Sequence, residues 1–483
     1  MRVLQVSAEI FPLLKTGGLA DVAGALPAAL TLAGCDVRLL LPGFAPILSD
    51  LQDAIVLGQR VTPWGDAVAL RRGRLATLDM QAYVIDATSL FARPGNPYQD
   101  AQGQPYADNC RRFALLGWMA GELAQGMDNQ WLPQVVHSHD WHAALAPAYI
   151  AFSRERQPRR VGCIYTVHNL AYQGVYASEH FAELGLPDAA FALEGLEFYG
   201  QISFMKAGLT YADSITTVSP TYAREIQTPE QGCGLDGLLR ARANVLSGIL
   251  NAVDETIWNP ATDKLTPFAY GPANRSGKAR CKAALQIEME LAVDSHAPLF
   301  GVVSRLTEQK GLPLVIAAID EMFARGGQLV VLGSGDEALE NALREQAVRR
   351  PRAVAVRLGY DEALAHRIFA ATDVTLVPSR FEPCGLTQMY GLKYGSLPLV
   401  RRVGGLADTV VDSTLEDLAE AKANGFVFDD FSAEGFARAM RRAFTLYARP
   451  TEWAAVVARA MRQPCGWEGS AASYLALYQG IAR

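Results

Sequence analysis

The chain has 483 residues, with 44 Lys and Arg against 50 Asp and Glu, so its formal net charge is −6 at pH 7. Hydrophobic residues make up 50% of the sequence and charged residues 19%, a composition that excludes a disordered or collagen-like chain and, at this length, predicts two or three domains. The acidic balance argues against a nucleic-acid-binding protein, which would need a basic face.

The seven cysteines are scattered and include no CxxC pair, which argues against a disulfide framework or a structural zinc site. The first residues, Met1 to Glu9, lead directly into a strand pattern and lack the charged, apolar and small-residue zones of a signal peptide. No uninterrupted apolar run approaches the roughly 18 residues of a membrane-spanning helix. We therefore expect a cytoplasmic protein without a membrane partner.

The first half of the sequence alternates short β-branched or Leu-rich runs with Ala- and Leu-rich helical patterns. The runs predict strands, in chain order, over Val3–Ser7, Val37–Leu41, Ala82–Asp86, Val135–Ser138, Cys163–Val167 and Ser214–Val218. The helical patterns include Leu19–Ala33 and Ala143–Phe152.

The second half repeats this alternation. Strands are predicted over Leu299–Val303, Gln328–Leu332, Ala353–Leu358, Val374–Pro378, Leu397–Arg401 and Gly425–Phe428. Helices are predicted between them, among others over Leu312–Arg325 and Ala338–Arg349.

Near-continuous apolar strands that alternate with helices indicate parallel sheets covered on both faces. A segment rich in turn-forming residues, 251–263, separates the two halves. We therefore predict an α/β protein with two Rossmann-like, doubly wound domains, 1–250 and 251–460, and a deep cleft between them. In such sheets ligands bind beyond the carboxyl ends of the strands, where the strand order reverses.

A glycine pair follows the first predicted strand and opens a helix, in the segment Lys15-Thr-Gly17-Gly18-Leu-Ala-Asp21. Glycines allow backbone N–H groups to approach an anion, the helix start adds partial positive charge, and Lys15 supplies a full charge nearby. The alternative is that Gly17 and Gly18 form only a tight strand-to-helix turn.

Two cations follow the first strand of the second half. Arg305 and Lys310 lie five residues apart across a turn and suit a diphosphate, because Arg grips oxygens in bidentate fashion and Lys acts as a point charge. A solvated surface pair is the alternative. The loop Gly333-Ser-Gly335 after the next strand adds a weak signal for the same phosphate site.

A carboxylate stands beside a turn that opens a helix in Glu382-Pro-Cys384-Gly385-Leu386-Thr387. Glu382 is a candidate partner for sugar hydroxyls or for a cationic sugar, and the N–H groups of residues 385–387 suit phosphate oxygens. Cys384 as a thiol nucleophile has no supporting motif, and its simplest role is packing.

Four of the seven histidines fall at two strand ends, in His137-Ser-His139-Asp140-Trp-His142 and in Thr166-Val-His168-Asn169. His139, Asp140 and His142 could be metal ligands, but the HEXXH spacing and zinc-type spacings are absent, and polar strand ends suit sugar hydroxyls equally well. A structural role for at least one of these histidines is also expected.

Together these segments resemble the bacterial glycogen synthases and plant starch synthases that use ADP-glucose. The resemblance covers nearly the whole chain and also includes Asn96-Pro-Tyr98, Asp108-Asn109, Lys206-Ala-Gly208, Trp258-Asn-Pro260, Phe381-Glu-Pro-Cys-Gly-Leu-Thr-Gln388 and Gly404-Gly-Leu-Ala-Asp408. It implies a GT-B fold and a final helix, within residues 461–483, that crosses back to the first domain; Trp467–Tyr478 resembles that helix.

The resemblance further implies transfer of glucose from ADP-glucose to the non-reducing 4-OH of an α-1,4-glucan, with retention and with no metal or other cofactor. Asp140, His168, Asn169 and Glu382 would surround the glucose, and Tyr98 would lie by the adenine. By motif match, the diphosphate would be held by Lys15, Gly18, Arg305, Lys310 and the Leu386–Thr387 turn. Further candidates for binding ADP-glucose are Gly17, Gly333, Cys384 and Gly385. The candidate catalytic residues are His168, Glu382, Arg305, Lys310 and Asp140.

Some positions depart from the family pattern. Val403 stands where the family usually has Thr before Gly-Gly-Leu, Cys233 stands at a usually aromatic position, and Pro464-Cys465-Gly466 replaces the usual lead into the last Trp. Two other functions stay open: a related GT-B transferase that uses UDP-glucose or makes a small disaccharide, and a catalytically silent glucan-binding protein. A glucan phosphorylase would need a pyridoxal phosphate lysine and usually a much longer chain.

Overall fold

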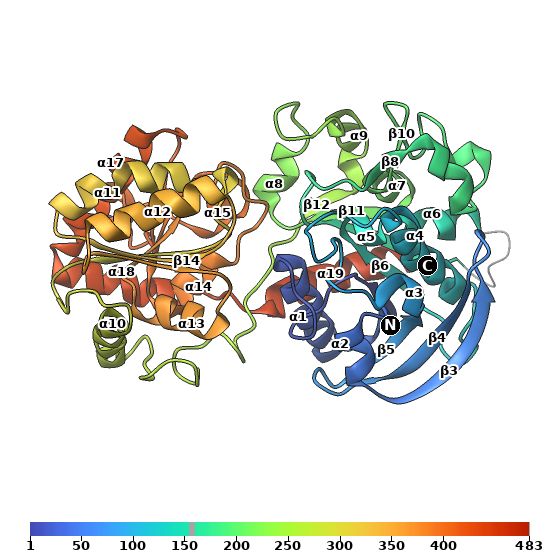
Figure 1. Cartoon of the computed structure of the whole chain (residues 1–483), viewed down its shortest axis with the longest axis horizontal. Coiled ribbons are helices and arrows are strands. Elements are labelled where there is room, and N and C mark those ends of the chain that lie inside the picture. Colours follow the sequence, from blue (N-terminus) through green and yellow to red (C-terminus); the bar gives the residue numbers. More distant parts are fainter. Residues whose placement is uncertain (154–159, 483) are drawn as a thin grey trace. The chain divides into compact units, whose positions relative to one another are not determined.

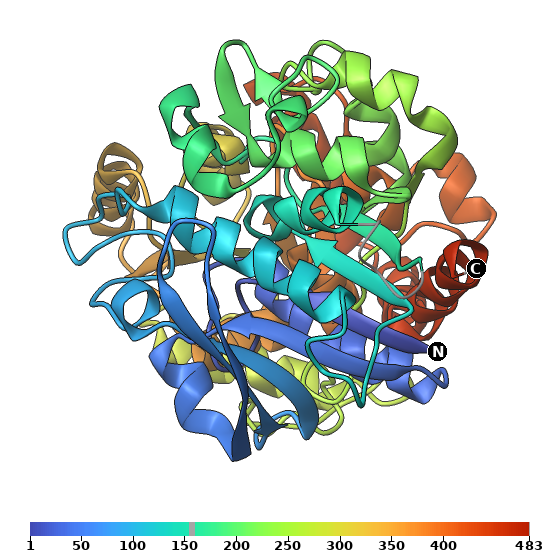
Figure 2. The ribbon, with the colours of Figure 1, turned by 90° about the vertical axis from the view of Figure 1, so that its right-hand side faces the viewer.

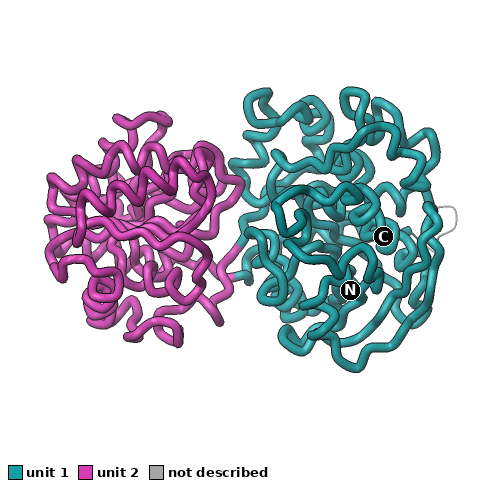
Figure 3. Tube along the Cα trace, in the orientation of Figure 1, with its two compact units in different colours: residues 1–251, 467–483 teal, residues 252–466 magenta. Residues whose placement is uncertain are grey.

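A computed structural model of the chain describes residues 1–153 and 160–482. The chain divides into two compact units, coloured separately in Figure 3. Unit 1 comprises Met1–Asn251 and Trp467–Arg483, and unit 2 comprises Ala252–Gly466. The division therefore falls at the start of the turn-rich segment 251–263, and residues 461–466 lie in unit 2 rather than with the last helix.

Unit 1 is built on a nine-stranded sheet in the order β12-β11-β7-β6-β1-β2-β5-β4-β3. Its strands are β1 (Arg2–Val6), β2 (Asp36–Pro42), β3 (Leu51–Val61), β4 (Ala67–Leu75), β5 (Met80–Asp86), β6 (Val135–His139), β7 (Gly162–Val167), β11 (Ser214–Thr217) and β12 (Leu246–Gly248). The strands from β12 to β5 pair in parallel, as expected from the sequence. At the other edge β5, β4 and β3 pair antiparallel, and the long β3–β4 hairpin curves away from the sheet (Figure 2).

Helices cover this sheet on both sides. They are α1 (Gly18–Leu32), α2 (Ala45–Asp50), α3 (Thr88–Phe91), α4 (Asn109–Ala124), α5 (Asp140–Ala143), α6 (Leu145–Phe152), α7 (Phe204–Tyr211), α8 (Pro220–Glu225), α9 (Asp236–Ala241) and the returning α19 (Trp467–Ile481). Helix α19 packs against α1 and β7, and its Tyr474 and Tyr478 are buried. A small antiparallel sheet orders β8 (Val175–Ala177), β10 (Gln201–Ser203) and β9 (Glu197–Phe198).

Unit 2 has a six-stranded, fully parallel sheet in the order β15-β14-β13-β16-β17-β18. Its strands are β13 (Leu299–Val303), β14 (Gln328–Gly333), β15 (Val354–Leu358), β16 (Val374–Val377), β17 (Leu397–Arg401) and β18 (Phe426–Phe428). Every residue of β14 is buried, as expected of an apolar strand between two helical layers.

The helices of unit 2 form the two layers that Figure 1 shows on either side of the sheet labelled at β14. One layer contains α11 (Leu312–Ala324), α12 (Glu337–Arg349), α15 (Gly404–Thr409) and α17 (Ala433–Tyr447), and the other contains α10 (Ser276–Glu288), α13 (Glu362–Ala371), α14 (Thr387–Tyr394) and α18 (Pro450–Arg462). The remaining short helix, α16, spans Leu415–Ala419. In the described part of the chain, no helix has both the length and the apolar composition needed to cross a membrane.

Among the parallel strands of each sheet, the strand order reverses once. In unit 1 the chain proceeds from β1 to β2 and later returns to β6 on the other side of β1, and in unit 2 it returns from β15 to β16 on the other side of β13. In open α/β sheets the carboxyl ends of such neighbouring strands frame the ligand site. The fold therefore directs attention to the segments after β1 and β6 in unit 1, and after β13 and β16 in unit 2.

Candidate active site

In unit 2 the loops that follow β13 and β16 are bonded to each other. The Arg380 amide donates to the Gln309 carbonyl at 2.8 Å, and the Gln309 side-chain amide donates to the Phe381 carbonyl at 3.2 Å. This pairing brings the Lys310 ammonium to 2.6 Å from the Glu382 carboxylate. The Ser379 hydroxyl donates to the same carboxylate oxygen at 2.9 Å. Glu382 is only 6% exposed, so this is a nearly buried ion pair.

Arg305 occupies a different environment from Lys310. Its side chain is exposed, and one of its guanidinium nitrogens lies 3.5 Å from the Gln309 side-chain oxygen. The structure thus brings Lys310 and Glu382 together at the reversal of strand order and leaves Arg305 with its guanidinium in solvent on the same loop.

The turn after Glu382 has the conformation that its glycine predicts. Gly385 has φ of 74°, and a Cβ there would lie 2.3 Å from the Gln388 side-chain oxygen, so glycine is required. Helix α14 begins at Thr387, and Leu386 is its N-cap residue. N–H groups at a helix start have no acceptor within the helix and are suited to bind an anion. Cys384 is buried, at 4% exposure.

Gly333 serves a close approach between two strand ends. A Cβ at this position would lie 1.9 Å from the Ser304 carbonyl oxygen, so the loop after β14 can lie against the loop after β13 only with glycine here. The Gly359 amide donates to the Gly333 carbonyl at 3.0 Å, and the next residue, Tyr360, is 73% exposed. An exposed aromatic side chain at this edge of the unit 2 sheet was not anticipated from the sequence.

In unit 1 the predicted glycine loop is occupied by a carboxylate of the chain itself. Glu9, which is 3% exposed, accepts hydrogen bonds from the Thr16 amide at 2.6 Å, the Thr16 hydroxyl at 2.5 Å and the Gly17 amide at 3.3 Å. Gly17 therefore donates to Glu9, while Gly18 begins α1. Lys15 pairs with Asp21 at 2.9 Å. Glu9 was missed in the sequence, although an acidic residue directly after a buried strand was an available signal.

The Tyr98 side chain is packed on several sides. The Tyr98 hydroxyl donates to Glu9, and its ring stacks on His142 with a centroid distance of 4.7 Å. Phe113 and Trp141 lie 5.8 and 6.1 Å from the same ring. This packing fixes the loop that carries Tyr98, and it occupies a ring that was expected to face a nucleotide base.

The histidines at the ends of β6 and β7 form a buried network with Gln5 of β1. His139 Nε2 lies 2.5 Å from the Gln5 side-chain oxygen, which can only accept, so His139 donates through Nε2. His139 Nδ1 then accepts from His168 Nε2 at 3.1 Å. His137 bonds Thr166 at 2.6 Å and the Tyr478 hydroxyl of α19 at 2.8 Å.

Burial holds the pKa values of these imidazoles below their usual range. The pKa of His137 and of His168 falls to about 3, and that of His139 falls well below its ordinary value, with the neighbouring histidines contributing to the shift for His137 and His139. These imidazole rings are therefore neutral. Because His168 donates through Nε2, its Nδ1 atom carries the lone pair. His168 can therefore accept a hydrogen bond from a hydroxyl group.

Asp140 follows β6 in a left-handed conformation, with φ of 59°, and is 7% exposed. Burial raises its pKa to about 7; the charge of Glu9 adds to the rise, while backbone N–H groups of Asn169, His168 and Trp141 oppose it. A carboxyl that titrates near neutrality at a strand reversal is a candidate functional group. Asn169 accepts from the Ala171 amide at 3.0 Å and so shapes the turn after β7.

The alternative reading of these side chains as a metal site finds no support in their geometry. His139 is bonded to Gln5 and His168, whereas His142 stacks on Tyr98. Within residues 1–153 and 160–482, His, Cys, Asp and Glu side chains form no group of three or more suited to hold a metal ion.

An aromatic pocket of about 560 Å³ lies within unit 1, lined in part by Trp141, the residue that follows Asp140. It is bordered by Tyr98, Trp141, Tyr172, Tyr176 and Phe198. Aromatic faces beside polar groups suit sugar rings, which present C–H faces and hydroxyl edges.

Two Rossmann-like units, each with polar groups gathered where its strand order reverses, define a glycosyltransferase of the GT-B fold class. The sequence agrees: residues 2–241 match the family described as starch synthase catalytic domain, and residues 297–445 match glycosyl transferases group 1. The chain belongs to the family of glycogen synthases and starch synthases, and it is a hexosyltransferase.

Relatives cover the whole chain. It is 62% identical to a glycogen synthase of Variovorax paradoxus, over 99% of this chain and 98% of that protein, and 59% identical to a glycogen synthase of Leptothrix cholodnii, over 100% of both. The catalytic domain of starch synthase IV from Arabidopsis thaliana, solved with ADP and acarbose, superposes with a TM-score of 0.90 at 31% identity, over 100% of this chain and 99% of that one. Sucrose-phosphate synthase from Thermosynechococcus elongatus shares the fold alone, with a TM-score of 0.60 at 18% identity over 99% and 98% of the two chains.

Proposed function

We propose that the protein is a glycogen synthase that transfers glucose from ADP-glucose to the non-reducing end of an α-1,4-glucan, with retention of configuration and release of ADP. The observation that carries the proposal is the nearly buried ion pair of Lys310 and Glu382, beside the start of α14, at the strand reversal of unit 2. Relatives named glycogen synthase and the starch synthase solved with ADP support the choice of substrates.

The donor diphosphate requires positive groups that act when the glycosidic bond breaks. Lys310 and the exposed Arg305 supply two cations on one loop, and the start of α14 supplies N–H groups. Their stabilisation grows as negative charge develops on the departing ADP, which is the property that accelerates a reaction. Tyr360 offers an exposed ring at the same edge of the unit 2 sheet, so we assign the adenine to Tyr360 rather than to the packed Tyr98.

The sugar that remains is oxocarbenium-like and needs negative or hydrogen-bonding partners. Glu382 acts as an electrostatic partner and not as a covalent nucleophile, because its carboxylate is already held by Lys310 and Ser379. Asp140 and the Nδ1 lone pair of His168 receive sugar hydroxyls. The acceptor 4-OH attacks from the face that ADP leaves, and a departing phosphate oxygen takes its proton. Each step uses groups of the chain and the donor, so the proposal needs no metal or other cofactor.

The glucan acceptor takes the aromatic pocket of unit 1. Trp141 and Tyr172 border it, and Tyr172 is 50% exposed, so sugar rings could reach its face. This position suits a long α-glucan better than a single free hexose, because the pocket of about 560 Å³ exceeds one sugar ring.

Initial rates of label transfer test the proposal. ADP-glucose and UDP-glucose are compared as donors, and glycogen and free glucose as acceptors, each with and without EDTA. We expect efficient incorporation only from ADP-glucose into glycogen, unaffected by EDTA, with the label released by an α-1,4-specific exo-glucanase. A preference for UDP-glucose or for free glucose would show that the assigned substrates are wrong. Absence of transfer would favour the silent glucan-binding protein. Loss of incorporation with EDTA would show that the reaction requires a metal ion. Recovery of a glucosyl adduct on Glu382 would refute its electrostatic role.

A further inference from the structure

A second pocket, of about 260 Å³, lies within unit 2 near the amino end of β16, whereas Lys310 and Glu382 lie beyond the carboxyl ends of the strands. It adjoins Asp373, which directly precedes β16, whereas Glu382 follows that strand. Helix α10 forms one wall with Lys278 and Lys282, and Trp453 of α18 contributes to an apolar wall. The proposed glucosyl transfer makes no use of this pocket.

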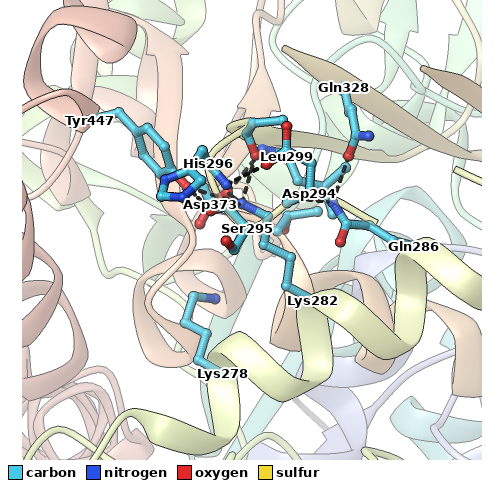
Figure 4. Close-up of polar contacts among 12 residues, drawn as sticks. Lys278, Lys282, Gln286, Asp294, Ser295, His296, Leu299, Gln328, Asp373 and Tyr447 are labelled. Atoms are coloured by element: carbon cyan, nitrogen blue, oxygen red, sulfur yellow. Dashed lines mark hydrogen bonds and ion pairs between the residues drawn. The ribbon is translucent and has the colours of Figure 1, made fainter. Parts of the chain in front are cut away.

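The two lysines lie one helical turn apart and extend toward the same polar cluster, but their surroundings differ (Figure 4). The Lys282 ammonium donates to the Ala297 carbonyl at 2.6 Å, the Asp373 carboxylate at 2.7 Å and the Tyr447 hydroxyl at 3.0 Å. Burial opposes its charge, yet Asp373 and Tyr447 outweigh burial and raise the pKa of Lys282. Lys282 is therefore a charged, structural ammonium group whose three N–H groups each have an acceptor.

Lys278 has carbonyl oxygens as its acceptors and no carboxylate in ion-pair contact among the described residues. Its nitrogen lies 3.0 Å from the Tyr394 carbonyl, 3.3 Å from that of Ala370 and 3.5 Å from that of Phe369. A neutral amine has two N–H donors and one lone pair, so the two nearer carbonyls suffice for its hydrogens. The neutral form thus has one lone pair that carries no hydrogen, and Lys278 is among the residues that line the pocket.

The charges around Lys278 favour that neutral form. Burial lowers its pKa to about 8; Asp373 and Cys281 act in the opposite direction, and Lys282 lowers it further. Tyr270 stands 5.7 Å from the Lys278 nitrogen, measured to its ring centre, and Tyr447 borders the pocket from α17. With this pKa, roughly a tenth of the amine is neutral at pH 7, against well under a thousandth for an ordinary lysine.

Arg275 gives the pocket a preference for anions. It borders the pocket one turn before Lys278, it donates to the Pro272 carbonyl at 2.9 Å, and it forms no ion pair with any side chain that the structure describes. Asp373 is the carboxylate at the pocket wall, and Lys282 neutralises it. A small anion that carries an apolar group fits the combination of Arg275 with the wall around Trp453.

We propose that Lys278 is a nucleophilic lysine that is acylated by a small acyl phosphate bound in this pocket. The Lys278 amine attacks the acyl carbon, a C–N bond forms, and the C–O bond to phosphate breaks, so that phosphate leaves with the electron pair. The proton lost from the amine passes to the departing phosphate or to water. Arg275 attracts the donor and stabilises the charge on the phosphate that leaves.

Acylation would reach the proposed active site through α14. The Lys278 ammonium holds the carbonyl of Tyr394, the last residue of α14, and the helix begins at Thr387 beside the Glu382 turn. The eight-residue helix spans only about 12 Å between these ends. An amide retains a single N–H and no charge, so acylation weakens the contact at one end of a short rigid element whose other end we assign to the diphosphate.

Labelling of the intact folded protein with acetyl phosphate tests the proposal independently of glucosyl transfer. Acetylation at Lys278, and at the exposed Lys264 and Lys422 as references, is quantified by peptide mass spectrometry from pH 6.5 to 9.5. We expect Lys278 to react at least about tenfold faster than the references at pH 7.5, with a rate that levels off above a midpoint near pH 8. An unmodified Lys278, or a pH profile like that of Lys264, would overturn the proposal.

Substitutions at two positions separate the steps. Arg275→Gln should lower the rate with acetyl phosphate severalfold but leave the rate with uncharged acetic anhydride unchanged, and an equal rate with acetyl phosphate would refute an anion pocket. Lys278→Gln, which mimics the acylated side chain, should reduce glucosyl transfer more than Lys278→Arg, which keeps the charge. Thermal unfolding of both variants shows whether each still folds, and equal activity of the two folded variants would refute the coupling through α14.

Discussion

The Lys310 ammonium lies 2.6 Å from the Glu382 carboxylate, and both side chains are held by loops that pair through backbone hydrogen bonds. Removing either member leaves the other unpaired in a nearly buried position, which is more costly than removing both. The pair therefore behaves as one unit in its effects on stability and on catalysis.

For Lys310→Ala we expect a decrease in kcat of about 10²–10³-fold, because the charge on departing ADP loses its point cation. Arg305→Ala should lower kcat to a similar extent with little effect on unfolding, since Arg305 is exposed. Steady-state kinetics with ADP-glucose and glycogen measure both. Near-normal turnover in both variants would remove the two cations from the mechanism.

A double-mutant cycle checks the coupling within this pair. Lys310→Met, Glu382→Gln and the double variant are compared by chemical unfolding. We expect the double variant to be more stable than the sum of the single losses predicts, by 1 kcal/mol or more as an order of magnitude. Additive losses would mean that the two groups do not interact in solution.

Asp140 should give the enzyme a pH dependence near neutrality. Its pKa is raised by burial to about 7, so the stability contributed by the neutral carboxyl is complete below its unfolded pKa and is lost as pH rises through about 7. Between pH 8 and pH 5 we expect wild-type Tm to rise relative to that of Asp140→Asn. Asp140→Asn should also lower turnover and remove the rise in activity through pH 7 that accompanies ionisation of Asp140. Parallel Tm curves for the two proteins would contradict this assignment.

Asparagine suits position 140 for a second reason. The residue has φ of 59°, a conformation that Asn and Asp adopt more readily than other side chains. Asp140→Ala should therefore be less stable than Asp140→Asn by roughly 1 kcal/mol, and the difference in free energy of unfolding between the variants isolates this backbone effect from the loss of charge.

Tyr360 and Tyr98 should differ in what their loss affects. Tyr360→Ala is expected to raise the KM for ADP-glucose severalfold and leave the KM for glycogen unchanged. The reason is that we assign the adenine of the donor, and no part of the glucan, to this exposed ring. Tyr98→Phe removes a hydroxyl bonded to Glu9 and should lower Tm. Tyr199→Ala, at an 82% exposed site in unit 1, is the matched control. An unchanged KM for ADP-glucose in Tyr360→Ala would mean that the adenine base binds at a side chain other than Tyr360.

Val403 allows a test of its departure from the family pattern. It is the N-cap of α15 without a side-chain cap, it packs with the buried Val400 and Leu406, and the next residue but one, Gly405, donates to the Glu382 carbonyl at 3.2 Å. Val403→Thr adds a capping hydroxyl and loses a methyl group, so we expect the free energy of unfolding to change by less than about 1 kcal/mol. A hydroxyl beside the Glu382 turn should lower the KM for ADP-glucose, and a raised KM would speak against a phosphate site there.

Strand periodicity predicted twelve of the thirteen parallel strands that the structure describes, because continuous apolar runs are a strong signal; the predicted Leu299–Val303 and Leu397–Arg401 coincide with β13 and β17. The parallel strand that was missed, β12, has only three residues. The β3–β4 hairpin escaped prediction because much of β3 is exposed and its residues carry no apolar alternation. The small sheet β8-β10-β9 was missed because strands of two or three residues leave no periodicity.

Parts of the candidate site could be predicted where a residue directly follows a predicted strand. Lys310 and Glu382 are 72 positions apart, yet each follows a predicted strand, and the reversal of strand order brings them together. Glu9 could not be assigned from the sequence, because its role depends on which amides the Lys15–Gly18 loop turns toward it. The packing around Tyr98 was equally hidden, since Tyr98 lies on a loop and His142 contacts its ring from α5.

The return of α19 to unit 1 constrains how a newly made chain acquires its structure. Tyr478 bonds His137 and Gln5, so the strand that carries His139 lacks part of its support until the last helix has been synthesised. All of unit 2 lies between these partners in the sequence, which at bacterial and eukaryotic translation rates of 5–20 residues per second amounts to about ten to forty seconds. Unit 2 is therefore synthesised before unit 1 has received its last helix, α19. Premature termination late in translation would remove α19 and so destabilise unit 1, although most of unit 1 is synthesised first.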